Sequence, residues 1–183
     1  MRMLSDRIAT VAALPFDLGA LKLHLRVEDD DYEDAAITNM GKTAAAEFEQ
    51  VAQIALLTQT IRLTIVDPVA GRLLALPIGP AEVANAPAVL IDGVAFTDFD
   101  FMGGHRPLIR WQDSYFGLTP TLIQIEYQAG FGNAAADIPA DIAQAIMDQT
   151  ALHYDGRSPM DAKSLTSSPH LARIAARYRG VQL

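Results

Sequence analysis

The sequence predicts an α+β fold in which a helical bundle is interrupted by an antiparallel β-sheet. Near both ends of the chain, apolar side chains recur at steps of three and four residues, as they do along one face of a helix. In the middle of the chain they alternate with polar side chains, which is typical of half-buried strands. We therefore expect two N-terminal helices and one long C-terminal helix, with the sheet inserted between them.

The composition limits the kind of protein that the chain can be. Its 183 residues fit one domain of ordinary size, and the absence of cysteine excludes disulfides, thiolate metal sites and cysteine nucleophiles. No apolar run approaches the roughly 18 residues that cross a bilayer. Asp6 and Pro15 interrupt the N-terminal segment where a secretory signal would need a basic flank and a longer apolar run. These features are typical of a soluble protein.

The charge is unevenly distributed along the chain. The net charge is -8, but the residues after Gly156 hold five basic side chains against one acidic one, a net of +4. The preceding residues hold nine basic and 21 acidic side chains, a net of -12. An acidic body therefore carries a basic C-terminal segment. The negative net charge argues against a surface that coats DNA.

Two helices are predicted within residues 17–52. Asp17 is placed to cap the first, and Asp30 with Glu33 has the spacing of a capping box for the second. The second helix should bury one apolar stripe. The residues of this stripe are Ile37, Met40, Ala44, Phe48 and Val51.

The acidic run at 28–34 and the tripeptide GKT at 41–43 resemble a metal site and a phosphate loop, but neither has the required spacing. A calcium loop that began at Asp29 would need glycine at position 34 and an acid at position 40. A phosphate loop would need glycine at position 36 and a preceding strand, and Ala36 lies in a predicted helix. Acids are stabilised at a helix N-terminus, and Gly41 is better interpreted as a point of close packing.

The β insert is predicted at 58–128. It begins with the alternation of Ile61, Leu63 and Ile65 with polar residues, and further strand-like runs follow. Asp92 and Gly93 have the sequence of a two-residue hairpin turn. The prolines between residues 77 and 87 favour an irregular crossing, and 101–107 is predicted as a loop.

A long helix is predicted at 138–155, ending at Gly156. A polar linker and a short amphipathic helix should follow, with Leu171, Ile174 and Tyr178 on one face and Arg173 and Arg177 beside it. We therefore expect one α+β domain over residues 1–156 and a linker with a basic segment over residues 157–183.

The sequence contains no arrangement of residues that predicts a reaction. Its four histidines are scattered, and no nucleophile elbow or dinucleotide fingerprint occurs. Two other functions stay open at this point. Trp111 and Tyr115 could anchor a small ligand or peptide on the sheet of a monomeric binding module. A metal-dependent hydrolase would have to use the aspartates at 29–31.

The order of the motifs resembles the head-to-tail connector family of long-tailed bacteriophages, also called adaptor or head-completion proteins and shared with phage-derived gene transfer agents. Three stretches carry the resemblance. They are LKLHLRVEDDDYEDAAI, LLTQTIRLTI and IQIEYQAGFGNAAADIPADIAQAIMDQTALHYDGR. They cover about a third of the chain in the family's order. The run EFEQVAQIALL lacks the family's glycine-bearing turn, and residues 73–117 have no counterpart that we can match.

The resemblance implies a structural protein of the virion neck, assembled in the bacterial cytoplasm, with no catalysis and no cofactor or metal. Such proteins form a ring, usually of twelve copies, that joins the capsid portal to the next tail or stopper protein. DNA passes through the channel without sequence-specific binding. The net charge adds the expectation that part of the acidic body lines this channel and repels the phosphates.

The C-terminal segment is the expected docking element for the portal or a neighbouring subunit. An amphipathic segment can fold into a partner's groove, with apolar anchors in the groove and arginines at its rim. The residues of this expected interface are Leu171, Arg173, Ile174, Arg177, Tyr178 and Arg179. The alternative is that the segment packs on its own body as a terminal helix.

Overall fold

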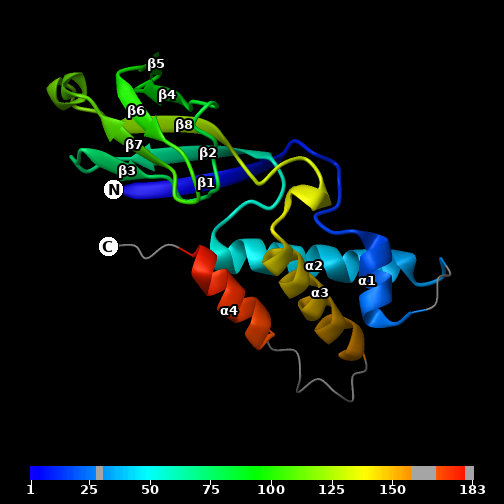
Figure 1. Cartoon of the computed structure of the whole chain (residues 1–183). Helices are drawn as coiled ribbons and strands as arrows, with labels where there is room; N and C mark the ends of the chain where they lie inside the picture. The colour runs from blue at the N-terminus through cyan, green and yellow to red at the C-terminus, as the bar shows by residue number, and fades with distance from the viewer. Residues whose placement is uncertain (28–30, 158–167, 180–183) are drawn as a thin grey trace. The chain divides into compact units, whose positions relative to one another are not determined.

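The computed structural model describes residues 1–27, 31–157 and 168–179 and divides the chain into two compact units (Figure 1). The β unit contains Met1–Ala12 and Thr58–Phe131, and the helical unit contains Ala13–Leu57 and Gly132–Leu183. The α+β class is confirmed. The division differs from the expected single domain, since the first twelve residues join the sheet and the C-terminal segment joins the helices. No described helix is both long and apolar enough to span a membrane.

The β unit is built on a five-stranded sheet in which every pair of neighbours is antiparallel. Its strands lie in the order β1 (Arg2–Ala9), β2 (Gln59–Val66), β8 (Leu122–Ala129), β4 (Ala88–Ile91) and β5 (Val94–Ala95). A second antiparallel sheet has the order β3 (Leu73–Ala75), β7 (Leu108–Trp111) and β6 (Phe99–Met102).

The alternation predicted for β2 is confirmed, because Ile61, Leu63 and Ile65 are buried while Arg62 between them is exposed. Ile123 and Ile125 of β8 lie on the same buried face. Alternating side chains point to opposite faces of a strand, so a run of this kind places one apolar row in the core. The core of the β unit is therefore built around the β2–β8 pair.

Two connections in the β unit also follow the prediction. Asp92 and Gly93 join β4 to β5 with φ values of 49° and 81°, as a two-residue hairpin requires. The Asp92 carboxylate accepts hydrogen bonds from the Thr121 hydroxyl at 2.7 Å and the Leu122 N–H at 2.8 Å, which lowers the pKa of Asp92. Between residues 77 and 87 the chain makes isolated bridges, among them Ala81 to Gly104, and forms no strand.

The predicted strands do not include β1 or β6, and both lie at sheet edges. Met3, Ser5, Arg7 and Ala9 of β1 share the face on which β2 buries its isoleucines, yet only Met3 among them is partly buried. Pairing with β2 along its whole length holds β1 in the sheet, and main-chain pairing produces no apolar pattern in the sequence.

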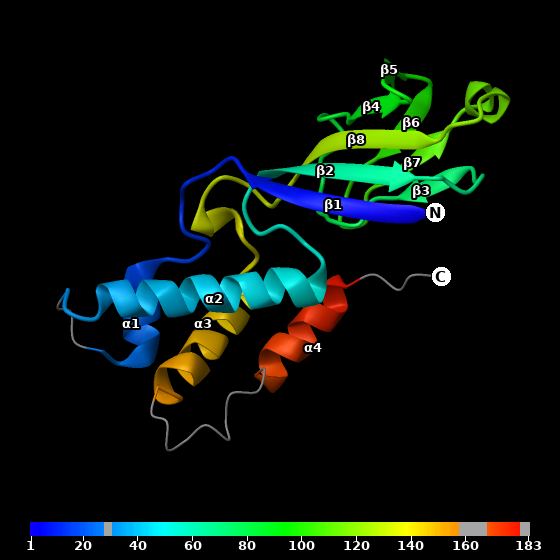
Figure 2. The same ribbon diagram turned by 180° about the vertical axis from the view of Figure 1, so that it is seen from behind.

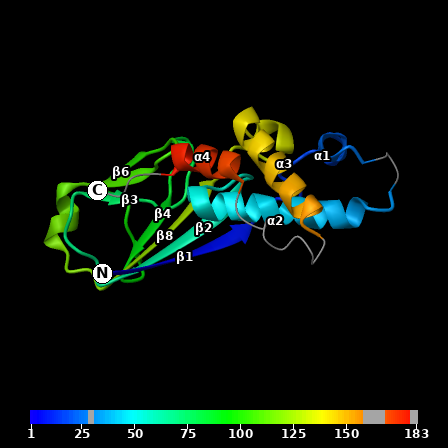
Figure 3. The same cartoon turned by 90° about the horizontal axis from the view of Figure 1, so that it is seen from below.

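Among the residues that the structure describes, the helical unit contains four α-helices, of which α2, α3 and α4 pack together (Figures 2 and 3). They are α1 (Leu18–Leu25), α2 (Asp34–Ala52), α3 (Ala140–Asp155) and α4 (Pro169–Tyr178). Ile37 and Phe48 of α2, Ile142 and Ile146 of α3 and Leu171 of α4 are fully buried. The predicted stripe of the second helix therefore meets α3 and α4 in one core, except at its C-terminal end, where Val51 is 36% exposed.

Gly41 lies inside α2, where the tripeptide GKT raised the question of a phosphate site. A Cβ atom built on Gly41 would lie 2.6 Å from Cζ and 2.7 Å from Cε1 of Phe16. Phe16 itself is buried. The predicted role of Gly41 as a point of close packing is confirmed, since only a residue without a side chain lets the Phe16 ring lie against the helix.

Candidate functional site

The three acids predicted to cap helices, Asp17, Asp30 and Glu33, differ in how the structure places them. The Asp17 side chain stands at the N-cap of α1, where its Oδ1 accepts a hydrogen bond from the Ala20 N–H at 2.7 Å. Asp30 lies outside the described residues. Glu33 occupies the N-cap position of α2, but its side chain makes no capping hydrogen bond. The expected capping box is therefore wrong as far as Glu33 is concerned, because α2 begins at Asp34 rather than after Asp30.

Glu33 instead joins the start of α2 to the end of α3. Its carboxylate accepts hydrogen bonds from the Tyr154 hydroxyl at 2.5 Å and from Arg157 Nη1 at 2.8 Å. The Arg157 guanidinium lies 3.8 Å from the centre of the Tyr154 ring. These two donors lower the pKa of Glu33, and the hydrogen bond to Glu33 raises the pKa of Tyr154. Glu33 therefore links the start of α2 to the C-terminal end of α3.

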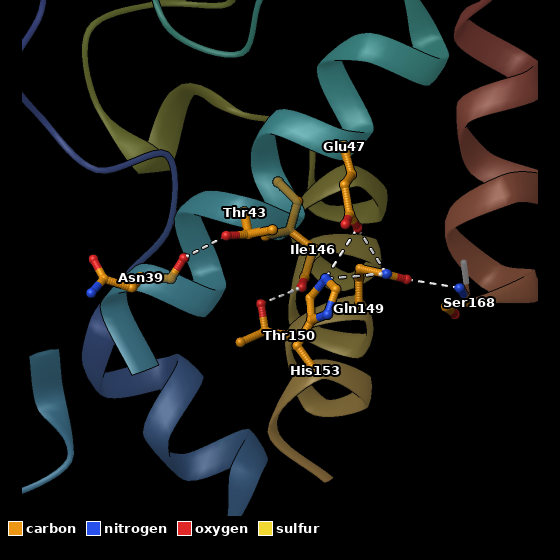
Figure 4. Close-up of polar contacts among 8 residues, drawn as sticks. All are labelled: Asn39, Thr43, Glu47, Ile146, Gln149, Thr150, His153 and Ser168. Carbon is orange, nitrogen blue, oxygen red and sulfur yellow. Dashed lines mark hydrogen bonds and ion pairs between the residues drawn. The ribbon is translucent and has the colours of Figure 1, made fainter. Parts of the chain in front are cut away.

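A buried amide joins three helices near the middle of the helical unit (Figure 4). Gln149 on α3 is 2% exposed, and its Nε2 donates to Glu47 Oε2 on α2 at 2.8 Å. Its Oε1 accepts from the Ser168 N–H at 2.7 Å, at the residue that caps α4. His153 Nε2 lies 3.1 Å from the same Glu47 oxygen. These bonds satisfy both ends of the buried Gln149 amide and link α3 to α2 and to the start of α4.

The Asp148 carboxylate contacts two of the four histidines. His24 Nε2 of α1 lies 3.2 Å from one oxygen, and His170 Nδ1 of α4 lies 2.5 Å from the other. Gln144 Nε2 donates to Asp148 Oδ1 at 2.8 Å. This arrangement brings together residues that are scattered in the sequence, and it ties α1 and α4 to α3.

The polar clusters of the helical unit tie its helices to one another. In residues 1–27, 31–157 and 168–179, no group of three or more His, Cys, Asp or Glu side chains is placed to hold a metal ion. Each histidine in the helical unit has a carboxylate neighbour on another helix, so its contacts serve the packing of that unit. A catalytic base would also need a nucleophile or substrate pocket beside it.

The aromatic pair considered as a ligand anchor belongs to the core of the β unit. Trp111 on β7 is 2% exposed, and Tyr115 lies in the short 3-10 helix Asp113–Gly117 and is 4% exposed. Their rings stack with centroids 4.6 Å apart, and Phe96 packs edge-on against both. The interpretation of Trp111 and Tyr115 as ligand anchors is therefore wrong, because neither ring is accessible to a ligand.

The residues predicted for docking separate into two groups on α4. Leu171 and Ile174 are buried against the other helices, and the Tyr178 ring packs edge-on against Phe48 at 6.5 Å. Tyr178 also donates to Asp141 Oδ1 at 3.0 Å. Its burial and this hydrogen bond raise the pKa of Tyr178. The apolar anchors therefore pack on their own body, as the alternative expected, and are not available to a partner.

The three arginines predicted for docking have a different environment. Arg173, Arg177 and Arg179 are exposed, and Arg177 Nη1 forms an ion pair with Asp141 Oδ2 at 3.3 Å. The sequence identified α4 as amphipathic but assigned its apolar face to a partner. The outward, basic face of α4 is what the structure leaves for a binding role.

The comparisons with known proteins agree on one fold. No protein-family model matches the chain, and no curated protein matches it. A chain in the virion of a native gene transfer agent particle is similar in structure, with a TM-score of 0.78 and 23% identity over 98% of this chain and 97% of that one.

Two chains from particle necks give the same result. One lies in the neck of an empty gene transfer agent particle, computed with C6 symmetry, and has a TM-score of 0.75 and 24% identity. The other lies in the neck of a native particle, computed with C12 symmetry, and has a TM-score of 0.73 and 22% identity. Each comparison covers 98% of this chain and 97% of the other. The chain therefore shares its whole fold with proteins of these particles.

Proposed function

We propose that this chain is a structural protein of the neck of a tailed phage or gene transfer agent particle, where copies of it form a ring between the capsid portal and the tail. The observation that supports this most directly is the agreement in fold over 98% of this chain and 97% of the neck chains. A match of both whole chains means that the two units occur together in the similar proteins, which a shared single motif would not imply.

The partners follow from this role. Neighbouring copies form the ring, expected to hold twelve, and the portal lies on one side of it while the next tail or stopper protein lies on the other. The C6 and C12 symmetry of the similar necks supports a closed cyclic arrangement. A closed ring of identical subunits uses a heterologous interface, in which two different surfaces of the same chain meet.

The role requires no chemistry from the chain. The absence of a metal-binding group among the described residues is compatible with it, and so is the use of the polar clusters in helix packing. We propose that the protein has no enzymatic activity and acts through assembly alone.

We also propose that part of the acidic body lines the DNA channel. A negatively charged lumen repels phosphates and lets DNA slide, whereas engaged lysines and arginines would add salt-dependent affinity. The residues before Arg157 supply the net charge of -12 that this requires. A ring map with a lumen formed mainly by Arg62, Arg106 and Arg110 would contradict the proposal.

Native mass spectrometry of the full chain mixed with the portal protein of the same particle tests the function. We expect a complex with about as many copies of this chain as of the portal, and no such complex with an unrelated ring protein of similar size. A chain that stays monomeric and binds no portal would refute the proposal. Truncation after Gly156 is not a suitable variant, since it removes Leu171 and Ile174 from the core.

A further inference from the structure

The outward face of α4 combines small and basic side chains in two parallel rows. Ala172 and Ala176 form one row at the i, i+4 spacing, and Arg173 and Arg177 form the adjacent row. All four residues are exposed. We call them the arginine–alanine face. Small side chains at this spacing let a neighbouring element approach the helix backbone closely, with the arginines at its side.

This face is held rigidly from behind. Leu171 and Ile174 fix the opposite side of α4 in the core, and the Ser168 N–H is held by the buried Gln149. Near the other end, Tyr178 and Arg177 both contact Asp141 of α3. A surface that is already ordered loses little conformational entropy on binding, so the rigidity of α4 favours an interface there.

The positive charge of the arginine–alanine face favours an acidic partner. No residue of α4 is acidic, and Asp141 is the carboxylate that the structure pairs with the face, through Arg177. Among residues 1–27, 31–157 and 168–179, Arg173 has no ion-pair partner. A second copy of α4 cannot be the complement, because a two-fold contact between identical faces would set arginines against arginines.

We propose that the arginine–alanine face is one half of the head-to-tail interface of the ring, and that its complement is the acidic body of the next copy of this chain. The inference rests on the ring proposed above. The face is basic, while the residues before Arg157 carry a net charge of -12, so one sequence provides both charges of the contact. Copies that meet through two different surfaces form a heterologous interface, which closes into a ring when the rotation between copies allows it.

Site-specific cross-linking identifies what covers the face. The chain has no cysteine, so Ala176→Cys carries a maleimide photo-cross-linker at a single position. In the assembled mixture of full chain and portal protein, we expect a product of two copies of this chain. Ala46→Cys, on the exposed side of α2, is the matched control and should give little of it. A product with portal or DNA instead, or equal products from both positions, would overturn the proposal.

Charge reversal measures the contribution of the arginine. We expect Arg173→Glu to weaken association between subunits about tenfold, since an attractive contact becomes a repulsive one, and raised salt should weaken the wild-type ring in the same direction. Lys42→Glu makes the same charge change on the exposed side of α2 and should leave assembly unchanged. Equal melting temperatures for the three proteins exclude misfolding.

The outcomes separate this inference from the proposed function. A wild-type chain that forms neither ring nor portal complex refutes the function. A wild-type chain that assembles, while Arg173→Glu assembles equally well with unchanged salt dependence, refutes the inference and leaves the ring in place.

Discussion

Gly41→Ala provides a direct test of the packing between α2 and Phe16. Replacing a glycine inside a helix with alanine should stabilise the helix by about 1 kcal/mol. Here the added Cβ would lie 2.6 Å and 2.7 Å from two atoms of the Phe16 ring, about 1 Å inside the usual carbon–carbon contact distance. Because Phe16 is only 6% exposed, its ring has little room to move.

The overpacking cost should exceed the gain in propensity. Inserting a methyl group into a packed core typically costs about 1–3 kcal/mol, so we expect Gly41→Ala to lower the free energy of unfolding by about 1 kcal/mol. The double-mutant cycle with Phe16→Ala separates the two effects. Once the ring is removed, the same Gly41→Ala change should stabilise the protein by up to about 1 kcal/mol.

Urea denaturation followed by circular dichroism at 222 nm measures these changes in the helical unit. The single tryptophan, Trp111, lies in the β unit, so its fluorescence follows the other unit in the same samples. A Gly41→Ala protein that is more stable than wild type with Phe16 present would refute the reasoning. An unchanged effect of Gly41→Ala in the Phe16→Ala background would refute it as well.

Two further predictions concern the polar contacts between helices. Gln149→Leu should lower the free energy of unfolding by about 2–3 kcal/mol in urea denaturation, because Glu47 and the Ser168 N–H each lose a buried partner; an unchanged value would contradict this role. Tyr154 and Arg157 hold the pKa of Glu33 below its ordinary range, so the stability that Glu33 contributes is complete at neutral pH and is lost as the pH falls through its folded-state pKa. Glu33→Gln should therefore flatten the acid side of the stability–pH curve measured between neutral pH and pH ~3, and a curve parallel to that of wild type would contradict the linkage.

The sequence predicted the elements whose side chains repeat with a clear period. The second helix, the long C-terminal helix and strands β2 and β8 each bury a row of apolar side chains, and the row is visible in the sequence. β1 could not be predicted in this way. All of its residues except the partly buried Met3 are exposed, and it is fixed by main-chain hydrogen bonds to β2, which depend little on the side chains.

The contacts of the candidate site were less predictable, because periodicity gives the faces of an element but not what covers them. Glu33 had the spacing of a local cap, yet its partners are Tyr154 and Arg157, more than a hundred residues away. The apolar face of α4 was recognised from the sequence, but it was assigned first to an external partner. Its partners are helices of the same chain, and an amphipathic pattern is the same whether the partner is internal or external.

The chain passes between the two units three times, after Ala12, Leu57 and Phe131. This order determines when each unit can fold during synthesis. β8 lies in the middle of the five-stranded sheet but is its last strand to leave the ribosome. The helical unit is completed later still, by α3 and α4. The sheet therefore cannot close until β8 has been made, and the helical unit cannot be completed until α4 has been made. A chain terminated before β8 would lack both cores.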